Sequence, residues 1–503
     1  MSTLQKKPVI IGAGPAGLTA AFELCKAGIR SIVLEKDNIV GGISRTVQYR
    51  GYHFDIGGHR FFTKVKPVED MWREVLQADF LHCQRLSRIY YGKKFFYYPL
   101  KAGNALRNLG ILNAVLILLS YLKAQAWPSK PETNFEQWVS NRFGYRLYSI
   151  FFKSYTEKVW GMPCTEISAE WPAQRIKGLS LLEAVKAALL QKQTNKDGDI
   201  IKTLIDAFDY PRKGPGMMWE RVANIVKESG SEVRLNAETL NILWDGTQVI
   251  GVRIKTDKGE EVVEGTDFVS SMPIRELIQR FDPPAPAEVV KAAESLKYRD
   301  FLTVALVVNK PDLFPDNWIY IHDPDVKLGR IQNFKNWSPE MVPDPAKSCL
   351  GLEYFCFEGD GLWTMSDQDL IALGKKELET LGLANAVDIE DGAVVRMPKA
   401  YPVYDPGYDL AVEVVRNFIQ SLSNIQLVGR NGMHKYNNQD HSMLTAMLAA
   451  KNILGHNYDL WSVNVDQEYQ EEIKGEKKGL DDLALVATTQ PRVPRRVERA
   501  PKP

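Results

Sequence analysis

The stretch Pro8-Val9-Ile10-Ile11-Gly12-Ala13-Gly14-Pro15-Ala16-Gly17 decides the fold. Its first four residues are apolar, as in a short buried strand, and the glycines that follow mark a tight turn into a helix. The helix is expected over the apolar-rich segment 18–27, and a second strand over 31–34, which ends at Glu35. Strand, helix and strand together predict a βαβ unit and therefore an α/β protein with a parallel, Rossmann-type sheet.

The glycine turn has the spacing of a dinucleotide-binding site and the required place between a strand and a helix. Gly12 permits the tight turn, Gly14 lets the backbone approach the phosphates, and Gly17 lets helix and strand pack closely. The N-terminus of the helix offers unpaired N–H groups to the pyrophosphate. Glu35, 18 residues after Gly17, is suited to accept hydrogen bonds from ribose hydroxyls. The residues predicted to bind the dinucleotide are Gly12, Gly14, Ala16, Gly17, Glu35 and Lys36.

Composition limits the remaining classes of protein. The 503 residues are too many for one hydrophobic core, so two or three domains are expected. The net charge of +1 provides no global field that would attract nucleic acid. Five cysteines without a CxxC pair argue against a disulfide framework and against a metal site, and they favour a reducing cytoplasm.

The pattern along the chain predicts a dinucleotide-binding domain built from three separate segments, 1–65, 205–275 and 395–458. In it, 267–271 is expected to return to the parallel sheet, 425–428 to be a short buried strand, 442–454 a helix, and 232–263 a β-meander. A helical insert over 66–204 and a β-rich substrate domain over 276–394 are expected between these segments. The charged, then proline- and arginine-rich segment 470–503 is predicted to be disordered.

The most apolar stretch covers residues 110–122 and falls short of the roughly 20 residues that a membrane-spanning helix needs. A buried helix is therefore expected there, with a membrane-dipping or lipid-facing helix as the alternative. The N-terminus goes from two lysines straight into the first strand, without the apolar region of a signal peptide. Neither a signal peptide nor a transmembrane span is predicted.

A second glycine motif, Gly41-Gly42-Ile43-Ser44-Arg45-Thr46, follows the ribose-binding carboxylate. It resembles the GG-containing motif of the group that comprises the FAD-dependent amine oxidases, the protoporphyrinogen oxidases and the UDP-galactopyranose mutases. In that group the segment wraps the pyrophosphate and leads to the flavin. The resemblance therefore implies FAD as the cofactor, with Gly41, Gly42 and Arg45 among its binding residues.

Further segments are more similar to the UDP-galactopyranose mutases than to the amine oxidases. Tyr155-Thr156-Glu157-Lys158-Val159-Trp160-Gly161 reproduces the YTEKxWG signature of the mutases. Asp55-Ile56-Gly57-Gly58-His59-Arg60-Phe61-Phe62 resembles their glycine-rich loop that places a histidine near the flavin N5. Ala400-Tyr401-Pro402-Val403 and Gly429-Arg430, followed by Tyr436, resemble their C-terminal segments. Gly329-Arg330-Ile331 matches the arginine that grips the substrate diphosphate.

The mutase resemblance implies a role for each matched residue. His59 is expected to tune the flavin, and Arg330 to hold the diphosphate with its fork of donors. Contacts to the cofactor are implied for Gly57, Gly58, Gly429 and Arg430. Contacts to the substrate are implied for Tyr155, Trp160, Arg175, Tyr401 and Tyr436. A uracil ring would stack on the face of Tyr155.

The sequence departs from the mutase pattern after the signature. It has Arg175 and then Leu179, where the mutases carry a second arginine, so one diphosphate clamp is expected to be missing. Trp318, Trp337 and the cluster Met217-Met218-Trp219 have no counterpart in that family. A different nucleotide sugar, or a lipid-linked one, is therefore an alternative substrate.

The function implied by the resemblance is conversion of a nucleotide-diphospho sugar from the pyranose to the furanose form, as in the biosynthesis of cell-surface polysaccharides. Reduced FAD would act as a nucleophile through N5. NAD(P)H is a candidate reductant, and a homo-oligomer is a candidate assembly. The main alternative is an FAD-dependent oxidase or desaturase of the protoporphyrinogen oxidase or amine oxidase type, which the many aromatic residues and the apolar stretch would suit. An FAD-bound assembly partner without enzymatic activity is the third hypothesis.

Overall fold

The computed structural model describes residues 6–98, 100, 102–169 and 207–463. The glycine turn lies in a five-stranded parallel sheet with the order β20-β13-β1-β2-β9. Its strands are β1 (Pro8–Ile11), β2 (Ile32–Leu34), β9 (Glu232–Arg234), β13 (Asp267–Ser270) and β20 (Ile425–Leu427). In its centre Ile10 pairs with Val33 on one side and with Val269 on the other. The predicted parallel sheet, the return of 267–271 to it and the short buried strand at 425–428 are confirmed.

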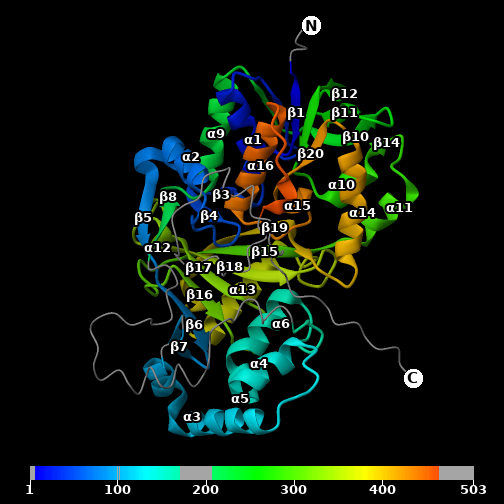
Figure 1. The fold of residues 1–503 in the computed structure, drawn as a ribbon. Helices are drawn as coiled ribbons and strands as arrows, with labels where there is room; N and C mark the ends of the chain where they lie inside the picture. Colours follow the sequence, from blue (N-terminus) through cyan, green and yellow to red (C-terminus); the bar gives the residue numbers. More distant parts are fainter. Residues whose placement is uncertain (1–5, 99, 101, 170–206, 464–503) are drawn as a thin grey trace, which may run out of the picture.

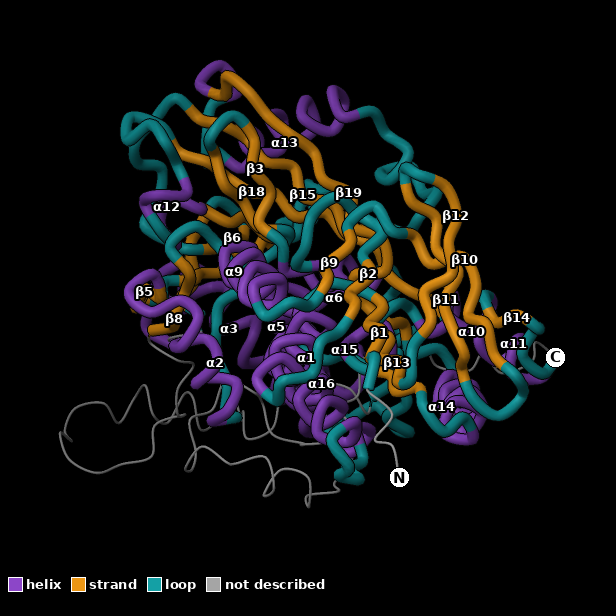
Figure 2. The backbone as a smooth tube through the Cα atoms, turned by 90° about the horizontal axis from the view of Figure 1, so that it is seen from above, coloured by secondary structure: helices purple, strands orange, loops and turns teal. Residues whose placement is uncertain are grey.

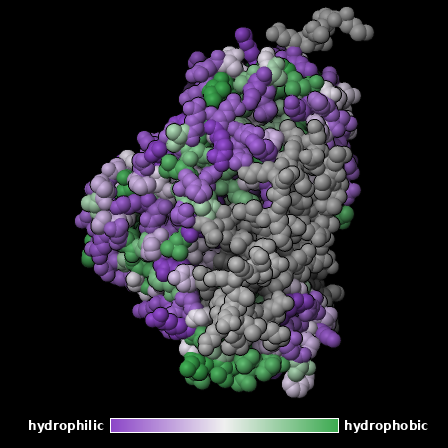
Figure 3. All heavy atoms as spheres, turned by 60° about the vertical axis from the view of Figure 1, so that its left-hand side comes forward, coloured by the Kyte–Doolittle hydropathy of each residue, from purple (hydrophilic) through white to green (hydrophobic). Residues whose placement is uncertain are grey.

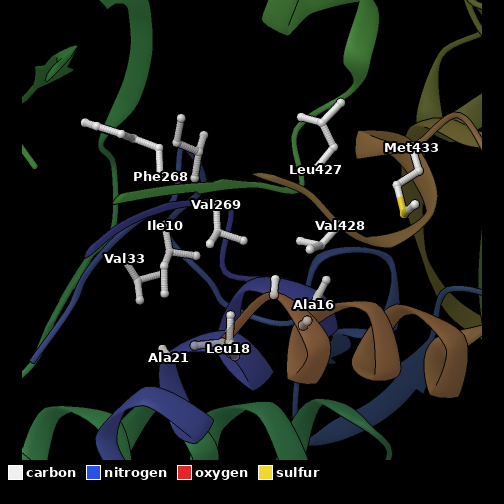
Figure 4. Packing of buried hydrophobic residues seen from close by; sticks show 14 of the residues in the cluster. Ile10, Ala16, Leu18, Ala21, Val33, Phe268, Val269, Leu427, Val428 and Met433 are labelled. Carbon is white, nitrogen blue, oxygen red and sulfur yellow. The ribbon is translucent and has the colours of Figure 1, made fainter. Parts of the chain in front are cut away.

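The helices α1 (Pro15–Lys26), α9 (Gly216–Glu228) and α16 (Gln439–Ile453) cover the parallel sheet, and Figure 2 shows them grouped on the same side of β1 and β2. Helix α1 packs against both of the others. The close-up in Figure 4 shows Ile10, Val33 and Val269 from the strands above Ala16 and Leu18 of α1. All five of these side chains are buried. The expected helix over 442–454 is thus confirmed, and it begins slightly earlier.

A second, four-stranded sheet lies beside the parallel one (Figures 1 and 2). Its strands are β10 (Glu238–Trp244), β11 (Val249–Thr256), β12 (Gly259–Glu264) and β14 (Phe281–Asp282), and its neighbouring helices are α10 (Ile274–Gln279), α11 (Ala287–Ser295) and α14 (Tyr408–Ser421). The strands β10 to β12 form the predicted meander. The expectation that 232–235 belongs to it is wrong, because β9 pairs in parallel with β2 at the edge of the other sheet.

A seven-stranded sheet with the order β19-β15-β18-β17-β16-β6-β7 lies next in Figure 1. Its strands are β6 (Ser87–Tyr91), β7 (Lys94–Tyr97), β15 (Lys297–Val308), β16 (Trp318–Ile321), β17 (Arg330–Asn333), β18 (Ser348–Cys356) and β19 (Ile389–Val403). Helix α13 (Asp367–Leu381) packs against β15 and β19. Every residue of β18 is buried, so this sheet has its own core.

The predicted domain boundaries cross this sheet. The aromatic strands β6 and β7 come from the segment expected to form a helical insert, yet β6 pairs in parallel with β16. Strand β19 runs without a break through the boundary expected between 394 and 395. The described part of 66–204 is therefore mixed, with strands as well as helices. The division into domains stays a prediction.

Smaller elements connect the sheets. They are β3 (Thr46–Tyr49) with β4 (Tyr52–Asp55), β5 (Phe80–Gln84) with β8 (Ala207–Pro211), α2 (Lys66–Leu76), α12 (Phe334–Trp337) and α15 (Gly429–Gly432). Short 3-10 turns cover Gly42–Ser44, Gln77–Asp79, Pro339–Met341, Ala386–Asp388 and Leu460–Ser462, and one π-helical turn covers Ser149–Lys153.

The helices at the end of the molecule opposite α1 are α3 (Ala102–Ala126), α4 (Phe135–Phe143), α5 (Tyr145–Tyr148) and α6 (Ser154–Trp160) (Figure 1). Helix α3 contains the apolar stretch 110–122, and Gly110 interrupts its helical geometry with φ 81° and ψ 162°. The expectation of a buried helix is wrong. Ile111 is 79% exposed and Leu112 is 75% exposed, while Ile117 on the opposite side is buried.

Candidate active site

One cleft connects the parallel sheet with the seven-stranded sheet, and its volume is about 1770 Å³. It collects nearly all of the predicted site residues from segments far apart in the chain. Those in its lining are Gly12, Gly14, Ala16, Glu35, Lys36, Gly42, Arg45, Gly57, Gly58, His59, Tyr155, Arg330, Tyr401, Gly429, Arg430 and Tyr436. The cleft is therefore the candidate active site.

Three glycines shape the phosphate end of the cleft. Gly12 has φ +100°, and a Cβ there would lie 2.3 Å from Ser271 Oγ, so the turn needs glycine. A Cβ on Gly17 would lie 1.8 Å from the carbonyl oxygen of Gly12, inside the contact between helix and strand. Gly14 differs, because its Cβ would meet the protein only at an ordinary 3.7 Å, on Gly42 Cα. Gly14 thus leaves space toward the cleft rather than toward its own fold.

The start of helix α1 is prepared for an anion. Gly14 occupies the N-cap position of the helix, so no side chain caps the first N–H groups. The first amide groups of the helix therefore face the cleft with the positive end of the helix dipole. The pyrophosphate of FAD fits this place, because backbone N–H groups and missing side chains are what a close phosphate contact needs.

Glu35 ends β2 as predicted and is held by backbone groups. Its Oε2 accepts a hydrogen bond from the amide of Ala13 at 2.8 Å, and its Oε1 accepts one from the amide of Asp37 at 3.0 Å. Burial raises the pKa of Glu35, and these two backbone hydrogen bonds oppose the rise. The carboxylate is fixed at the cleft wall, where it can accept hydrogen bonds from the ribose of FAD.

Arg45 lines the same end of the cleft but is already bonded within the protein. Its Nε donates to the carbonyl oxygen of Gly42 at 2.7 Å, and its guanidinium forms an ion pair with Asp37. A Cβ on Gly41 would lie 3.0 Å from Arg45 Cα, so the paired glycines let this loop fold tightly. Arg45 therefore also fastens the loop that follows Glu35.

His59 lies between the cofactor end and the substrate end of the cleft. Its Nδ1 is 3.3 Å from the carbonyl oxygen of Gly57. Burial, and then the nearby positive charges of Arg430 and Arg330, lower the pKa of His59 to about 4. The imidazole is therefore neutral at physiological pH and can donate or accept a hydrogen bond without adding charge.

Arg330 projects from β17 and is bound to a buried carboxylate. Its Nη2 lies 2.5 Å from Glu353 Oε2, and the side chain of Glu353 is completely buried. Gln332 Nε2 donates to the other oxygen, Oε1, at 2.7 Å. Burial alone lowers the pKa of Arg330, but Glu353, with smaller contributions from Tyr155 and Tyr320, raises it well above its usual value. A permanently charged fork is thus fixed in one orientation.

Tyr155 reaches the cleft from helix α6. Its ring stacks on His322, with centroids 4.9 Å apart and planes at 7°, and it meets Tyr320 edge-on at 5.5 Å. Burial raises the pKa of Tyr155 well above its usual value. The stack on His322 fixes the plane of the Tyr155 ring at the cleft wall.

The rest of the YTEKxWG signature attaches helix α6 to the seven-stranded sheet. Lys158 Nζ donates to the carbonyl oxygens of Asp323 at 2.6 Å and Leu328 at 2.9 Å. Arg299 caps the end of the helix through the carbonyl oxygens of Lys158 and Val159, both at 3.2 Å. A Cβ on Gly161 would lie 2.5 Å from Arg299 Nη1. These residues position Tyr155 and do not themselves line the cleft.

Two tyrosines and Arg430 form the wall opposite α6. The rings of Tyr401 and Tyr436 are stacked with centroids 5.7 Å apart. The guanidinium of Arg430 lies 5.3 Å from the Tyr401 ring and 5.1 Å from the Tyr436 ring. Arg430 also donates to the carbonyl oxygens of Asn437 and Ala400, both at 2.8 Å. Gly429, with φ +82°, allows the chain to pass close to Ala16 of α1.

One predicted substrate residue, Trp160, does not line the cleft, and another lies outside the described residues. Trp160 is partly buried and packs in the core between helices α4 and α6, so its position is that of a packing residue. Arg175 lies outside the described residues, as do Leu179 and the segment 470–503. The Met217–Trp219 cluster belongs to α9, where Trp219 is buried against Trp72. Trp318 and Trp337, in contrast, line the cleft, with ring centroids 5.3 Å apart.

Several residues of the site were not predicted from the sequence. Glu353 and Gln332 orient Arg330, His322 supports Tyr155, and Arg299 anchors α6. They come from strands β15, β17 and β18 and from the end of β16. A buried glutamate such as Glu353, inside an otherwise apolar strand, is the only one with a recognisable pattern.

The sequence and the fold agree on the family. Residues 15–453 match the flavin-containing amine oxidoreductases, and the chain belongs to this family. The protein is therefore an FAD-dependent enzyme of the amine oxidase superfamily, and the predicted cofactor is confirmed. Its relatives include the 15-cis-phytoene desaturase of Synechococcus elongatus, which is 25% identical over 53% of this chain and 57% of that protein. The L-amino-acid oxidase BjussuLAAO-I of Bothrops jararacussu is 24% identical over 61% of this chain and 60% of that protein.

The chain thus spans under two thirds of the length of these curated relatives. Among solved structures, reduced UDP-galactopyranose mutase has a similar fold, with a TM-score of 0.77 and 23% identity. That likeness covers 90% of this chain and 97% of the mutase. At this level of identity it establishes the fold and leaves the reaction to be argued from the site.

Proposed function

We propose that the protein is a mutase that converts a nucleotide-diphospho sugar between its pyranose and furanose forms. The observation that carries this proposal is the charge and shape of the substrate end of the cleft. Arg330 and Arg430 are two fixed positive charges, and with the hydroxyls of Tyr155, Tyr401 and Tyr436 they offer a dense set of donors. A diphosphate is the ligand that such a set binds best.

The nucleoside would lie toward helix α6. The stack of Tyr155 on His322 fixes an aromatic plane in the cleft wall. Bases stack on such planes with roughly 1–3 kcal/mol per base. Trp318 and Trp337 also contact this cleft, but their side chains are almost completely buried in the core behind it. A nucleotide sugar other than UDP-galactose, or a lipid-linked sugar, is an alternative substrate for the same cleft.

Bound FAD in its reduced form supplies a nucleophilic nitrogen, N5, for the anomeric carbon of the sugar. The residues of this chain bind and orient the substrate around it. Arg330 and Arg430 would hold the negative charge of the departing diphosphate within the cleft, because their guanidinium groups are fixed by Glu353 and by backbone carbonyls. Neutral His59 would hydrogen-bond at the junction of the two halves without repelling the arginines.

An FAD-dependent oxidase or desaturase is the second candidate. Its support is the similarity in sequence to the phytoene desaturase and the L-amino-acid oxidase. Against it stands the polar lining of the substrate end, since an apolar substrate would place hydrocarbon against the guanidinium groups of Arg330 and Arg430 and the nearby tyrosine hydroxyls. An amino-acid substrate would satisfy one arginine with its carboxylate, and it is therefore the stronger form of this alternative.

The redox state separates the two candidates. Under anaerobic conditions, the oxidised protein is mixed with UDP-sugars, L-amino acids and a carotenoid precursor while its flavin absorbance is followed. We expect no bleaching by any of them. After reduction with dithionite, chromatography should detect furanose product from a nucleotide sugar. Bleaching by an amino acid or a polyene, with no product from the reduced protein, would overturn the mutase proposal in favour of the oxidoreductase.

A further inference from the structure

Helix α3 is attached to the protein through its polar side and exposes its apolar side. Asn113 accepts a hydrogen bond from Arg146 Nη2 at 2.8 Å, and Ser120 accepts one from the Arg146 amide at 3.1 Å. Ile117 and Tyr121, on the same side of the helix, are buried. A helix of a soluble domain normally has the opposite arrangement, with the apolar stripe inside.

The outward side of α3 is a continuous apolar stripe. Its residues follow helical spacing and are at least 40% exposed. They are Ile111, Leu112, Val115, Leu116, Leu118, Leu119 and Leu122, and Leu106, also exposed, lies before the break at Gly110. Trp127, just beyond the helix, is 78% exposed. Figure 3 shows hydrophobic residues gathered at the end of the molecule that holds α3 in Figure 1. Exposed apolar surfaces of this kind mark interaction sites rather than ordinary protein surface.

Within the chain segment that carries the stripe, the charged residues have a single sign. The chain contains no aspartate or glutamate from Phe80 to Pro131. Among the described residues of this segment, the exposed lysines and arginines are Lys93, Lys94, Arg107, Lys123 and Lys130. The whole protein has a net charge of only +1, so this concentration is local. Basic residues beside an exposed apolar helix face, with a tryptophan at its end, are typical of helices that lie in the interface of an anionic membrane.

We propose that the outward face of α3, together with Trp127, docks the protein on the surface of a lipid bilayer that contains anionic headgroups. The helix would lie in the plane of the membrane, with its apolar stripe below the headgroups and Arg107 and Lys123 beside the phosphates. This inference does not depend on the mutase proposal, because it concerns a face that shares no residue with the cleft lining.

Docking in the plane fits α3 better than crossing the membrane. By length and composition, Gly103–Ala126 is long and apolar enough to span. The break at Gly110, however, leaves the segment 111–126 as the straight part of the helix. At 1.5 Å per residue this part is about 24 Å long, less than the ~30 Å of a bilayer core. Its inner side is also fastened to Arg146 and to the core around Ile117.

A second copy of the chain is a poorer occupant of this face. Two copies that met through α3 would bring their own Arg107 and Lys123 side chains together, and like charges at an interface cost affinity. An anionic bilayer instead satisfies the apolar stripe and the basic rim at the same time. Charge complementarity therefore selects the membrane.

The test is cosedimentation of the full-length, FAD-loaded protein with vesicles of phosphatidylcholine, with and without phosphatidylglycerol. We expect binding to the anionic vesicles that weakens with added salt. The double variant Leu112→Ser/Leu119→Ser should lower the partition coefficient by at least about tenfold. The matched control is Val387→Ser/Leu410→Ser, which removes two exposed apolar residues elsewhere (91% and 67% exposed) and should leave binding unchanged.

A second pair of variants isolates the charges. Arg107→Gln/Lys123→Gln should weaken binding to anionic vesicles by roughly fivefold per charge and leave binding to neutral vesicles unchanged. Flavin absorbance and circular dichroism verify that each variant is folded. The inference is wrong if the wild-type protein binds neither kind of vesicle, or if the α3 variant and its control behave alike. It is also wrong if the α3 variant only converts a dimer into a monomer, because the face then joins two copies of the chain.

Discussion

The two ends of the cleft recognise their ligands by different means. The cofactor end is built mainly by backbone from residues 12–45, where the glycines remove side chains and the start of α1 presents amide groups. The substrate end is built by side chains from α6, β17, β19 and the segment around 430–436. The cofactor end comes from one short stretch of sequence and recognises its ligand by shape. The substrate end is brought together by the tertiary fold and recognises its ligand by polar contacts.

The difference also appears in how each end is supported. At the cofactor end, close packing of the backbone holds the site in place, since a Cβ on Gly17 would lie 1.8 Å from a backbone oxygen. At the substrate end, buried polar groups hold the site in place, since Glu353 fixes Arg330 and His322 fixes the plane of Tyr155. A substitution at the cofactor end should therefore abolish folding or FAD binding, whereas a substitution at the substrate end should weaken binding gradually.

The largest effect is expected within the glycine turn, where Gly17→Ala and Gly14→Ala form a matched pair. Gly17→Ala forces the new Cβ against the Gly12 carbonyl and should prevent folding. Gly14→Ala meets only an ordinary contact of 3.7 Å and should fold, but its methyl group occupies the space of the pyrophosphate. Soluble yield and thermal unfolding measure the first effect. For Gly14→Ala, FAD titration should give an affinity at least about tenfold lower than that of the wild type. Stoichiometric FAD in Gly14→Ala would contradict the assignment of the pyrophosphate to this turn.

At the substrate end, Arg330→Lys should weaken the binding of a nucleotide-diphospho sugar by roughly 10- to 100-fold, since hydrogen bonds to charged groups contribute roughly 1.5–3 kcal/mol. Lysine keeps the charge but loses the fork, part of which is bonded to Glu353. FAD content should not change. Isothermal titration of the reduced protein measures the affinity. The control is Arg142→Lys, because Arg142 lies on α4, where it forms an ion pair with Glu132. Equal affinity in both variants would place Arg330 outside the substrate site.

The sequence predicted the cofactor end well for a physical reason. The turn, the start of the helix and Glu35 follow one another within a short stretch, so their spacing is visible in the chain itself. Resemblance to a family extended this to Gly57, Arg330, Tyr401 and Arg430, which the cleft brings together. The network that fixes them was not visible, because Glu353 and His322 meet their partners only through pairing of β17 with β18 and packing of α6 on the sheet.

Two expectations of the sequence analysis differ from the positions in the structure for the same reason. Trp160 was assigned to the substrate from its place in the signature, yet it packs in the core beside α4. The apolar stretch of α3 was assigned to the interior by composition, yet its apolar side faces outward. Composition and motif state which residues are present, and only the fold decides the direction in which they point.

A smaller effect is expected at Tyr155, where Tyr155→Leu and Tyr155→Phe separate the ring from the hydroxyl. Leu removes the aromatic plane that stacks on His322 and should weaken UDP binding by roughly tenfold, within the range of base stacking. Phe keeps the plane and should lose less. Competition with a fluorescent nucleotide measures both variants. If Tyr155→Phe and Tyr155→Leu weaken nucleotide binding equally, the contribution comes from the Tyr155 hydroxyl and the stacking hypothesis is wrong.

The smallest effect is expected from His59, which lies where the two ends of the cleft meet. Because its pKa is lowered to about 4, the imidazole does not titrate between pH 5 and 8 in the folded protein. His59→Gln, which keeps a neutral hydrogen-bonding side chain, should therefore leave the pH profile of nucleotide-sugar binding parallel to that of the wild type over this range. A profile that loses an inflection near pH 6 in the variant would show that His59 is charged during binding.

The stability of the same pair of proteins gives an independent measure of the His59 pKa. An unfolded histidine has a pKa of about 6.5, so the folded protein binds fewer protons than the unfolded chain between pH 6.5 and about 4. The contribution of His59 to stability is complete above pH 6.5 and is lost as the pH falls through about 4. His59→Gln removes this dependence, and its urea midpoint should fall less steeply with acid than that of the wild type. Parallel midpoints down to pH 4 would mean that the folded His59 titrates normally, and that neither its burial nor the two arginines of the substrate end shift its pKa.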